Sequence, residues 1–507
     1  HDFNSVKSAA VNAVAEKLEQ TKAAQEAQAS TAAKDTLVIA TANETGSLTT
    51  NLHNATAGDY MNKLTHNSLF MLNENMEVVP DLVESYEALS DTEWTFKLIE
   101  GVKFHNGAEM KAADVVASIN QCKESPEVAQ YGKAIASIEA VDDYTVKIVT
   151  DGPQSGLLSD LCHHGNFILP ADLIASGHDF NKEPIGTGPY VFKEWKKGES
   201  VTLEAFDDYF LGEAPIETVT WKIIPEGSSR TMALEAGEVD IVWNVDAIDC
   251  VNVEANPDVL LLSQPSASIE YMGMNTSKEK FSDVRVRQAI NMAIDQQVFI
   301  DTIVEGRGTP ANSYINSMIP GWTDEVTAYE YDLEKAKALM AEAGYPDGFD
   351  CSIYVNGDNR TRSATIVQAQ LAEIGINVEI STYEWGALLE ILTAGDHELF
   401  FLGWSNSSFD ADGSTFALFH SSNFGATGNR AWLDDEQVDS LIEQAQVEVD
   451  HEKRMDLYKQ LQFRLKELAP WVPMYYKDDN VGVRADLKGF RLHKGATHYI
   501  GNAHYEE

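Results

Sequence analysis

The chain has 507 residues, 44% of them apolar, and carries 80 acidic against 37 basic side chains, for a formal net charge of −43. This length exceeds the roughly 250–300 residues that a single hydrophobic core supports, so we expect two or three lobes. The negative charge repels nucleic acid and anionic lipid headgroups, which argues against both as direct partners.

The cysteines and the hydrophobic runs exclude further classes of protein. The four cysteines lie far apart without a C-x-x-C pair, which argues against a thiolate zinc site and leaves disulfide pairing open. No run reaches the ~18 apolar residues of a membrane span, and no hydrophobic signal-peptide core is present. We therefore expect either a cytosolic protein or a chain that has already been processed.

The order of the predicted elements indicates an α/β chain. Residues 1–35 keep helical spacing on a thin alanine face and predict a solvated helix or tether. Period-2 alternation and β-rich runs then predict strands at 36–40, 93–98, 135–140, 144–149, 190–195, 200–205, 219–224, 239–243, 269–274, 351–355, 378–381, 399–403 and 472–476. Helical periodicity predicts helices at 58–69, 112–122, 229–236, 284–294, 333–343, 363–373, 385–392, 435–447 and 451–468. This alternation is typical of mixed sheets covered by helices.

A chain reversal is predicted at Gly186-Thr187-Gly188-Pro189-Tyr190. We attribute it to glycines that tolerate positive φ and to the fixed φ of proline. The two alternating stretches that follow, 190–195 and 200–205, predict a β-hairpin. We interpret this point as the return of the chain from an inserted lobe to the lobe in which it began.

No complete catalytic or metal-binding motif is present. Ser277-Lys278-Glu279-Lys280 fits S-x-x-K but lacks the companion motifs of that enzyme class, so a hydrolase based on Ser277 is a distant alternative. Asp410-Ala411-Asp412-Gly413 lacks the later acidic positions of an EF-hand. His163 and His164, if they lie on one strand, point to opposite sides and rarely chelate one ion. We expect no enzyme, no resident metal and no cofactor.

Aromatic and small polar residues gather late in the chain. Trp385 opens a predicted helix, and Trp404 follows a predicted strand and precedes Ser407 and Asp410. Tryptophan beside small polar groups is typical of a binding cleft. A plain core role for both tryptophans is an equal alternative.

Ordered motifs over nearly the whole chain give a resemblance to a known family. The chain resembles the extracytoplasmic solute-binding proteins of the peptide, nickel and opine ABC importers, which include the dipeptide- and oligopeptide-binding proteins. The motifs are Pro80-Asp81-Leu82-Val83-Glu84-Ser85-Tyr86, Gly101-Val102-Lys103-Phe104-His105-Asn106-Gly107, Ala113-Asp114-Val115-Val116, the Gly186–Tyr190 motif, Leu234-Glu235-Ala236-Gly237-Glu238-Val239-Asp240, Asp283-Val284-Arg285-Val286-Arg287-Gln288-Ala289-Ile290 and Tyr331-Asp332-Leu333-Glu334-Lys335-Ala336.

The resemblance implies a periplasmic-binding-protein-like clamshell with mixed sheets, of class II and the peptide-binding type. Lobe I would take residues 36–71, 186–288 and 485–507, the inserted lobe II residues 72–185, and lobe III residues 289–484. A peptide or peptide-like solute would lie between lobes I and III and be delivered to ABC transporter permease subunits. The protein would be an extracytoplasmic monomer, either a cell-surface lipoprotein or periplasmic.

The resemblance also assigns candidate ligand contacts. Trp385 and Trp404 match pocket-lining tryptophans of the oligopeptide-binding relatives. The peptide anchors, however, are missing, because Ser407 stands at the ammonium-holding aspartate and Tyr354 at the carboxylate-holding arginine of the dipeptide binders. We therefore expect a ligand without free zwitterionic ends.

Two replacements for the lost anchors are conceivable. Asp410 could take the place of the aspartate, and Arg360 or Arg362 that of the arginine. For the two arginines, a solvated helix N-terminus is the favoured interpretation.

Three further residues are weaker candidates. His163 and His164 stand where the nickel-binding relative carries an arginine that reaches its metal chelate, so one of them could contact ligand. The bland alternative is a loop pair with one ring packed and one exposed. Asn275 is a candidate on the lobe I side. The alternative functions are a nickel or metal-chelate binding protein and a ligand-sensing receptor with the same fold.

Overall fold

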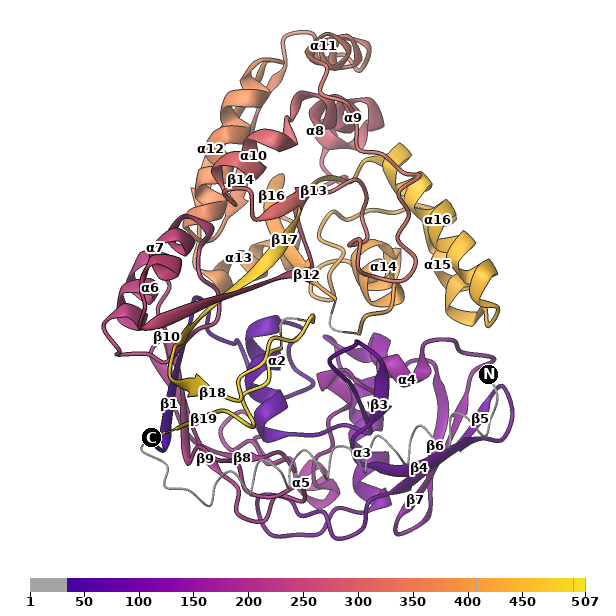
Figure 1. Ribbon diagram of the computed structural model, residues 1–507. Helices are drawn as coiled ribbons and strands as arrows, with labels where there is room; N and C mark the ends of the chain where they lie inside the picture. The colour runs from indigo at the N-terminus through magenta and orange to yellow at the C-terminus, as the bar shows by residue number, and fades with distance from the viewer. Residues whose placement is uncertain (1–33, 407, 496, 507) are drawn as a thin grey trace. The chain divides into compact units, whose positions relative to one another are not determined.

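The computed structural model describes residues 34–406, 408–495 and 497–506, and the chain divides into two compact units (Figure 1). Among the described residues, unit 1 comprises 34–245, 252–262 and those after 480, and unit 2 comprises 246–251 and those between 263 and 480. The predicted tether at 1–35 falls almost wholly outside the described residues. Among the helices of the described part, none is long and apolar enough to cross a membrane.

A mixed sheet forms the base of unit 1. Its first strand, β1, pairs in parallel with β10 and β11, and the antiparallel strands β9 and β8 extend the sheet beyond β10. The end of β17 pairs with β11 in antiparallel orientation. Trp221, Trp243 and Tyr190 are buried in its core. The strands are β1 (Thr36–Thr41), β8 (Tyr190–Lys196), β9 (Ser200–Ala205), β10 (Thr218–Ile223), β11 (Ile241–Val242) and β17 (Trp471–Arg484).

A second, separate sheet of unit 1 has four antiparallel strands in the order β4-β5-β7-β6. Phe96 and Leu98 alternate into its buried face, as the period-2 pattern predicts. Every strand of this sheet falls within the range expected for lobe II. The remaining elements of unit 1 are β2 (Phe70–Leu72), β3 (Val78–Pro80), β4 (Val83–Ala88), β5 (Glu93–Leu98), β6 (Ile135–Asp142), β7 (Thr145–Thr150), β18 (Leu487–Lys488), β19 (His504–Tyr505), α2 (Thr56–Thr65), α3 (Ala112–Lys123), α4 (Leu157–Asp160), α5 (Ala171–Ser176) and α6 (Gly227–Glu235).

The predicted hairpin is confirmed, but our reason for the two glycines before it was wrong. β8 and β9 form the hairpin, with Gly198 at φ +76° in its turn. Gly186 and Gly188 do not have positive φ. Instead, a Cβ on Gly186 would lie 2.2 Å from the Thr65 carbonyl oxygen, and one on Gly188 would lie 2.5 Å from the Thr65 carbonyl carbon. The two glycines are required because the backbone after α2 passes against them.

A mixed sheet also forms the centre of unit 2, in the order β15-β14-β16-β12-β17, with β13 paired to β17. β14 runs parallel to β15 and β16, whereas β12 and β16 are antiparallel. Apolar side chains of β14 and β16, among them Ile353 and Phe401, lie in the largest core cluster. The strands are β12 (Val259–Met274), β13 (Gly308–Pro310), β14 (Phe349–Val355), β15 (Ile376–Thr382) and β16 (Leu399–Ser405).

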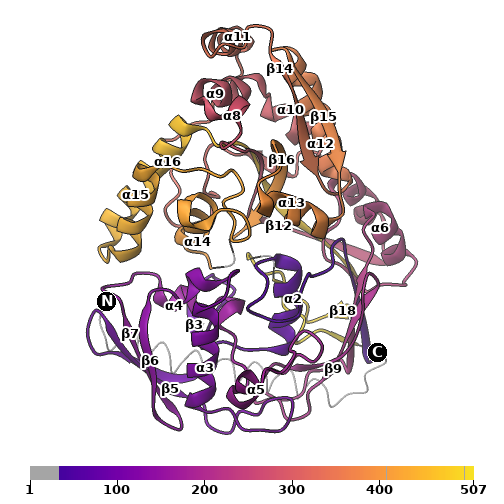
Figure 2. The same ribbon diagram turned by 180° about the vertical axis from the view of Figure 1, so that it is seen from behind.

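Helices cover this sheet, and the last two, α15 and α16, pack against each other (Figure 2). Five of the helices of unit 2 begin with an Asp N-cap whose side chain accepts from a backbone N–H. Such caps satisfy the first free N–H groups or place negative charge beside them. The helices are α8 (Glu279–Ser282), α9 (Val284–Ala293), α10 (Gln296–Thr302), α11 (Leu333–Glu342), α12 (Asp358–Ala372), α13 (Trp385–Ala394), α14 (Asp412–Phe419), α15 (Glu436–Val447) and α16 (His451–Leu468); α7 (Cys250–Ala255) contains a change of unit.

Candidate functional site

The two candidate tryptophans both lie in unit 2 and are half-buried. Trp404 is the penultimate residue of β16, not a loop residue after the strand as expected. Its indole Nε1 donates to the Gly413 carbonyl at 3.1 Å, and its side chain packs against a small buried cluster of Ile269, Ala311 and Tyr476. Trp385 begins α13 and packs on the neighbouring core cluster. Neither side chain is fully enclosed, so each retains surface that a ligand can contact.

Tyr354 brings a further half-buried aromatic ring to unit 2. It lies on β14 in register with Phe400, and its ring stacks on Tyr383 at a centroid distance of 5.8 Å. Tyr354, Tyr383, Trp385 and Trp404 all pack on the edge of one core cluster. They supply apolar and stacking area but no charge.

A buried ion pair between Glu270 and Arg360 is the main feature that the sequence did not predict. Arg360 Nε donates to Glu270 Oε1 at 2.5 Å and Nη2 donates to Oε2 at 3.2 Å. Burial by itself raises the pKa of Glu270, but the Arg360 guanidinium outweighs it and holds the pKa below its usual range. A Cβ on Gly403 would lie 2.7 Å from Glu270 Oε2, so this glycine leaves room for the pair.

The favoured interpretation of Arg360 as a solvated residue was therefore wrong. Arg362 does lie nearer the surface and donates to the Thr302 carbonyl at 2.8 Å. A signal for the pair was present in the sequence, because Glu270 is the only charged residue in the strand segment 269–274. A lone carboxylate in such a strand needs a partner.

Asp410 is likewise paired within unit 2. Its two carboxylate oxygens accept from Arg454 Nη1 at 2.7 Å and Nη2 at 2.9 Å. Burial opposes the charge of Arg454, but Asp410 more than compensates and raises the pKa of the guanidinium. An Asp410 carboxylate in this fork is not a free charge for a ligand ammonium. The neighbouring candidate, Ser407, lies outside the described residues.

Asn275 lies in unit 2, and its amide is used inside the protein. Nδ2 donates to the carbonyls of Gly395 and His397 at 3.1 and 2.9 Å, and Oδ1 accepts from the Ser277 hydroxyl at 2.7 Å. The residue is fully buried. It links two segments of the fold, and the hydroxyl hydrogen of Ser277 is used in this bond.

His163 and His164 lie in unit 1 and are both buried. They are not on a strand, because His164 begins a 3₁₀ turn and His163 caps it. Their ring centroids are 4.0 Å apart, and the stack continues from His163 to Tyr131 at 3.5 Å and from His164 to His53 at 4.3 Å. The expectation of one packed and one exposed ring was wrong.

The two rings differ in what their nitrogens contact. His164 Nδ1 lies 3.2 Å from Asp59 Oδ1, and Nε2 lies 3.0 Å from the His53 carbonyl. His163 accepts from the Gly165 N–H at Nδ1, and no described residue lies within hydrogen-bonding distance of its Nε2. His163 is therefore the better ligand candidate of the two. Among the described residues, no group of three His, Cys, Asp or Glu side chains is placed to hold a metal ion.

A family model and individual relatives of known function both match solute-binding proteins. Residues 77–426 match the model of the bacterial extracellular solute-binding proteins, family 5 middle region. The heme-binding protein A of Haemophilus influenzae is 31% identical and the dipeptide-binding protein of Escherichia coli 29%, with 82% and 85% of this chain covered and 82% and 86% of theirs.

Comparison of the fold with solved structures agrees with the sequence matches. The structure superposes on the periplasmic binding protein DppA from Helicobacter pylori, solved in complex with the peptide STSA, with a TM-score of 0.89 and 28% identity, over 95% of this chain and 100% of that one. This match confirms the expected fold class and a binding role without catalysis. The chain belongs to the family 5 bacterial extracellular solute-binding proteins, the substrate-binding proteins of ABC importers.

Proposed function

We propose that this protein captures a peptide-like solute whose ends are not both charged, and delivers it to the permease of an ABC importer. The observation that carries the proposal is the state of the charges in unit 2. The two groups that could replace the missing peptide anchors, Arg360 and Asp410, are already neutralised by Glu270 and Arg454. The aromatic rings nearby remain half-buried.

A zwitterionic dipeptide would have to compete with these internal pairs. Separating one member of a buried pair costs about 3–5 kcal/mol, because the remaining charge is left without a partner. A ligand with an amide or an acyl group at its end needs only hydrogen bonds and stacking on aromatic faces. Neutral or partly blocked peptides are therefore the favoured substrate class.

The test is a matched series of one tripeptide sequence with free ends, an acetylated N-terminus, an amidated C-terminus, or both modifications. We expect the doubly blocked form to raise the melting temperature at least as much as the free form, since ligand that binds only the folded state stabilises it. Binding of the free peptide at least 100-fold tighter than the blocked form would contradict the proposal.

The role of Trp404 is tested by Trp404→Ala in the same assay. Loss of stacking area is expected to weaken binding about tenfold or more, at about 1–3 kcal/mol for one buried aromatic contact. The matched control is Tyr331→Ala, an exposed aromatic of the same unit at 50% exposure. Equal affinity of both variants would assign Trp404 to packing alone.

A nickel or metal chelate is the second candidate, supported by the unengaged Nε2 of His163. A chelate that brings its own ligands needs only one imidazole donor from the protein. Nickel–histidine mixtures belong in the same melting screen, with His163→Gln as the variant that removes the donor. A signalling receptor would differ in its gene neighbourhood, where paired permease and ATPase genes favour transport.

We propose an extracytoplasmic location with a lipid anchor or a periplasmic form, a monomeric state, and the three-lobe division given above. The separate four-stranded sheet within residues 72–185 supports an inserted lobe II.

A further inference from the structure

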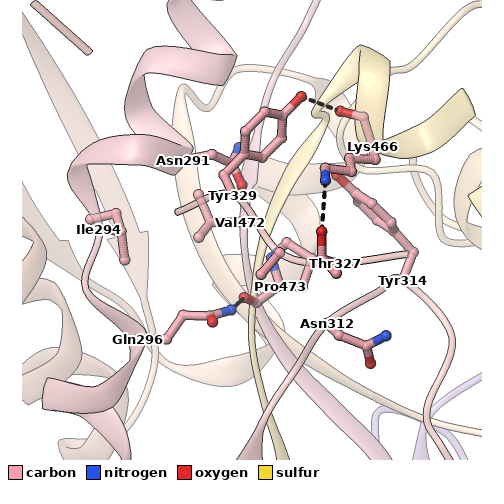
Figure 3. Close-up of a pocket in the computed structure, with 11 residues that line it drawn as sticks. Asn291, Ile294, Gln296, Asn312, Tyr314, Thr327, Tyr329, Lys466, Val472 and Pro473 are labelled. Atoms are coloured by element: carbon pink, nitrogen blue, oxygen red, sulfur yellow. Dashed lines mark hydrogen bonds between the residues drawn. The ribbon is translucent and has the colours of Figure 1, made fainter. Parts of the chain in front are cut away.

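A small polar cavity lies inside unit 2 and is lined by none of the candidate residues described above (Figure 3). Its volume is about 20 Å³, which accommodates one particle of about the size of a water molecule. It lies between α9, the end of α16, the start of β17 and the segment 312–329, and it is open to solvent beside the exposed Thr327. The residues that matter for its chemistry are Asn291, Tyr314, Thr327, Tyr329 and Lys466.

Most amide and hydroxyl donors around the cavity are already used. Asn291 Nδ2 donates to the carbonyls of Arg287 and Trp471 at 3.0 and 3.1 Å. Gln296 Nε2 donates to two further carbonyls, and Tyr329 donates to the Lys466 carbonyl at 2.7 Å. These side chains hold the walls together and have no N–H or O–H left for an occupant.

Three other groups can still donate into the cavity. Lys466 Nζ gives one of its three hydrogens to Thr327 Oγ1 at 3.1 Å, as Figure 3 shows. The hydroxyl of Thr327 keeps its own hydrogen after accepting this bond. The buried Tyr314 also lines the cavity, and its hydroxyl can donate. An ammonium and two hydroxyls therefore point to an occupant that accepts hydrogen bonds.

The charge around the cavity distinguishes an anion from water. Neither Lys466 nor Arg287 forms an ion pair with any carboxylate of the described residues, although the chain has 80 acidic against 37 basic side chains. Arg287 is 4% exposed and donates only to carbonyls, those of Leu468, Phe281 and Ser282. Asp283, which interacts electrostatically with Arg287, forms its ion pair with Arg285 at 2.6 Å.

The position of Arg287 brings its charge to the cavity wall. It lies one turn before Asn291 on α9, and its guanidinium interacts electrostatically with the cavity residue Tyr314. Burial lowers the pKa of Arg287 to about 10, and the electrostatic interactions with Tyr314 and Asp283 offset this only in part. A buried charge is costly until an opposite charge approaches it.

We propose that this cavity binds one small monovalent anion, with chloride as the abundant candidate, through Lys466, Tyr314 and Thr327. Arg287 contributes a second positive charge from behind the wall. The anion would join α9, α16 and the segment 312–329 and so stabilise unit 2, independently of the solute that the protein transports.

The test compares thermal melting in sodium chloride and in sodium gluconate at equal ionic strength, with crystals soaked in sodium bromide to locate the anion. We expect a melting temperature about 2 °C higher in chloride and an anomalous bromide peak in the cavity. Lys466→Met and Tyr314→Phe should each abolish the difference between the two salts. The control Lys453→Met removes an exposed positive charge from the same helix and should keep the difference.

Three outcomes would overturn the proposal. Equal melting temperatures in both salts without a bromide peak would mean that the cavity holds water. A bromide peak without a chloride-dependent melting temperature would indicate an adventitious ion only. A chloride effect that persists in both cavity variants would place the anion elsewhere on the molecule. Because the readout is the difference between salts, a variant that is less stable overall still gives an answer.

Discussion

Arg360 stands in the first turn of α12, where a positive charge is disfavoured by the helix dipole. The residue is tolerated there because Glu270, on the neighbouring strand β12, accepts two of its hydrogen bonds. The ion pair thus compensates an unfavourable helix position and an otherwise lone carboxylate together. Each residue alone would be a defect of the fold.

Removing one partner of this pair should therefore cost more than removing both. We expect Arg360→Met to lower the free energy of unfolding by about 3–5 kcal/mol, because Glu270 is left buried without compensation. The double variant Glu270→Met/Arg360→Met should recover most of that loss. Urea unfolding of the two single variants and the double variant gives the coupling free energy directly.

The matched control is Arg362→Met. Arg362 lies two residues after Arg360 on α12, and its guanidinium donates to a backbone carbonyl. We expect its effect to stay within about 0.5 kcal/mol. Additive effects of Glu270→Met and Arg360→Met would contradict a coupled pair.

At the level of elements, the sequence predicts those whose periodicity is local. Glu93–Leu98 and His451–Leu468 are found as β5 and α16 with the predicted bounds. α14 was missed because Gly413 through Phe419 is buried on all sides, so it shows no amphipathic period. β12 was predicted only at its end, since Pro265 interrupts its first half.

The candidate site was less predictable than these elements, for a physical reason. Glu270 and Arg360 are 90 positions apart, so no local spacing reveals their contact. The half-buried aromatics were found because tryptophan is rare and large. Their partners depend on the register of β12 against β16, which only the folded sheet specifies.

The connection before β8 gives a prediction at the same scale. We expect Gly188→Ala to destabilise unit 1 by about 2 kcal/mol or more, because its Cβ would lie 2.5 Å from the backbone of Thr65 and backbone cannot yield as a side chain does. The control is Gly46→Ala, whose Cβ meets nothing within 4 Å at a φ that is not positive. Equal melting temperatures of the two variants would contradict the close approach.

At the scale of the whole molecule, buried histidines should make the protein sensitive to mild acid. Burial lowers the pKa of His53, His66 and His498 to about 3 and that of His397 to about 4, from an ordinary value of 6.5. Below pH 6.5 these histidines become protonated in the unfolded chain but stay neutral in the folded protein. Stability is therefore full above pH 6.5 and falls as the pH drops toward 3.

Between pH 6.5 and pH 5 each such histidine should remove about 2 kcal/mol from the free energy of unfolding. Asp479 acts in the opposite direction, because burial raises its pKa to about 6, so the folded state binds its proton first below that pH. One acid cannot offset several histidines. The net expectation is a melting temperature that decreases steadily from pH 7 to pH 5.

The histidine origin of this slope is tested with His66→Phe, compared with His451→Phe at an exposed position on α16. Both variants change the net charge of the unfolded chain equally, so relief of self-repulsion in this acidic protein cancels between them. His66→Phe should flatten the loss between pH 7 and pH 5 by about 2 kcal/mol, even if it is less stable at both values. If the two variants lose stability equally between pH 7 and pH 5, the loss does not come from His66, and protonation of carboxylates is the remaining cause.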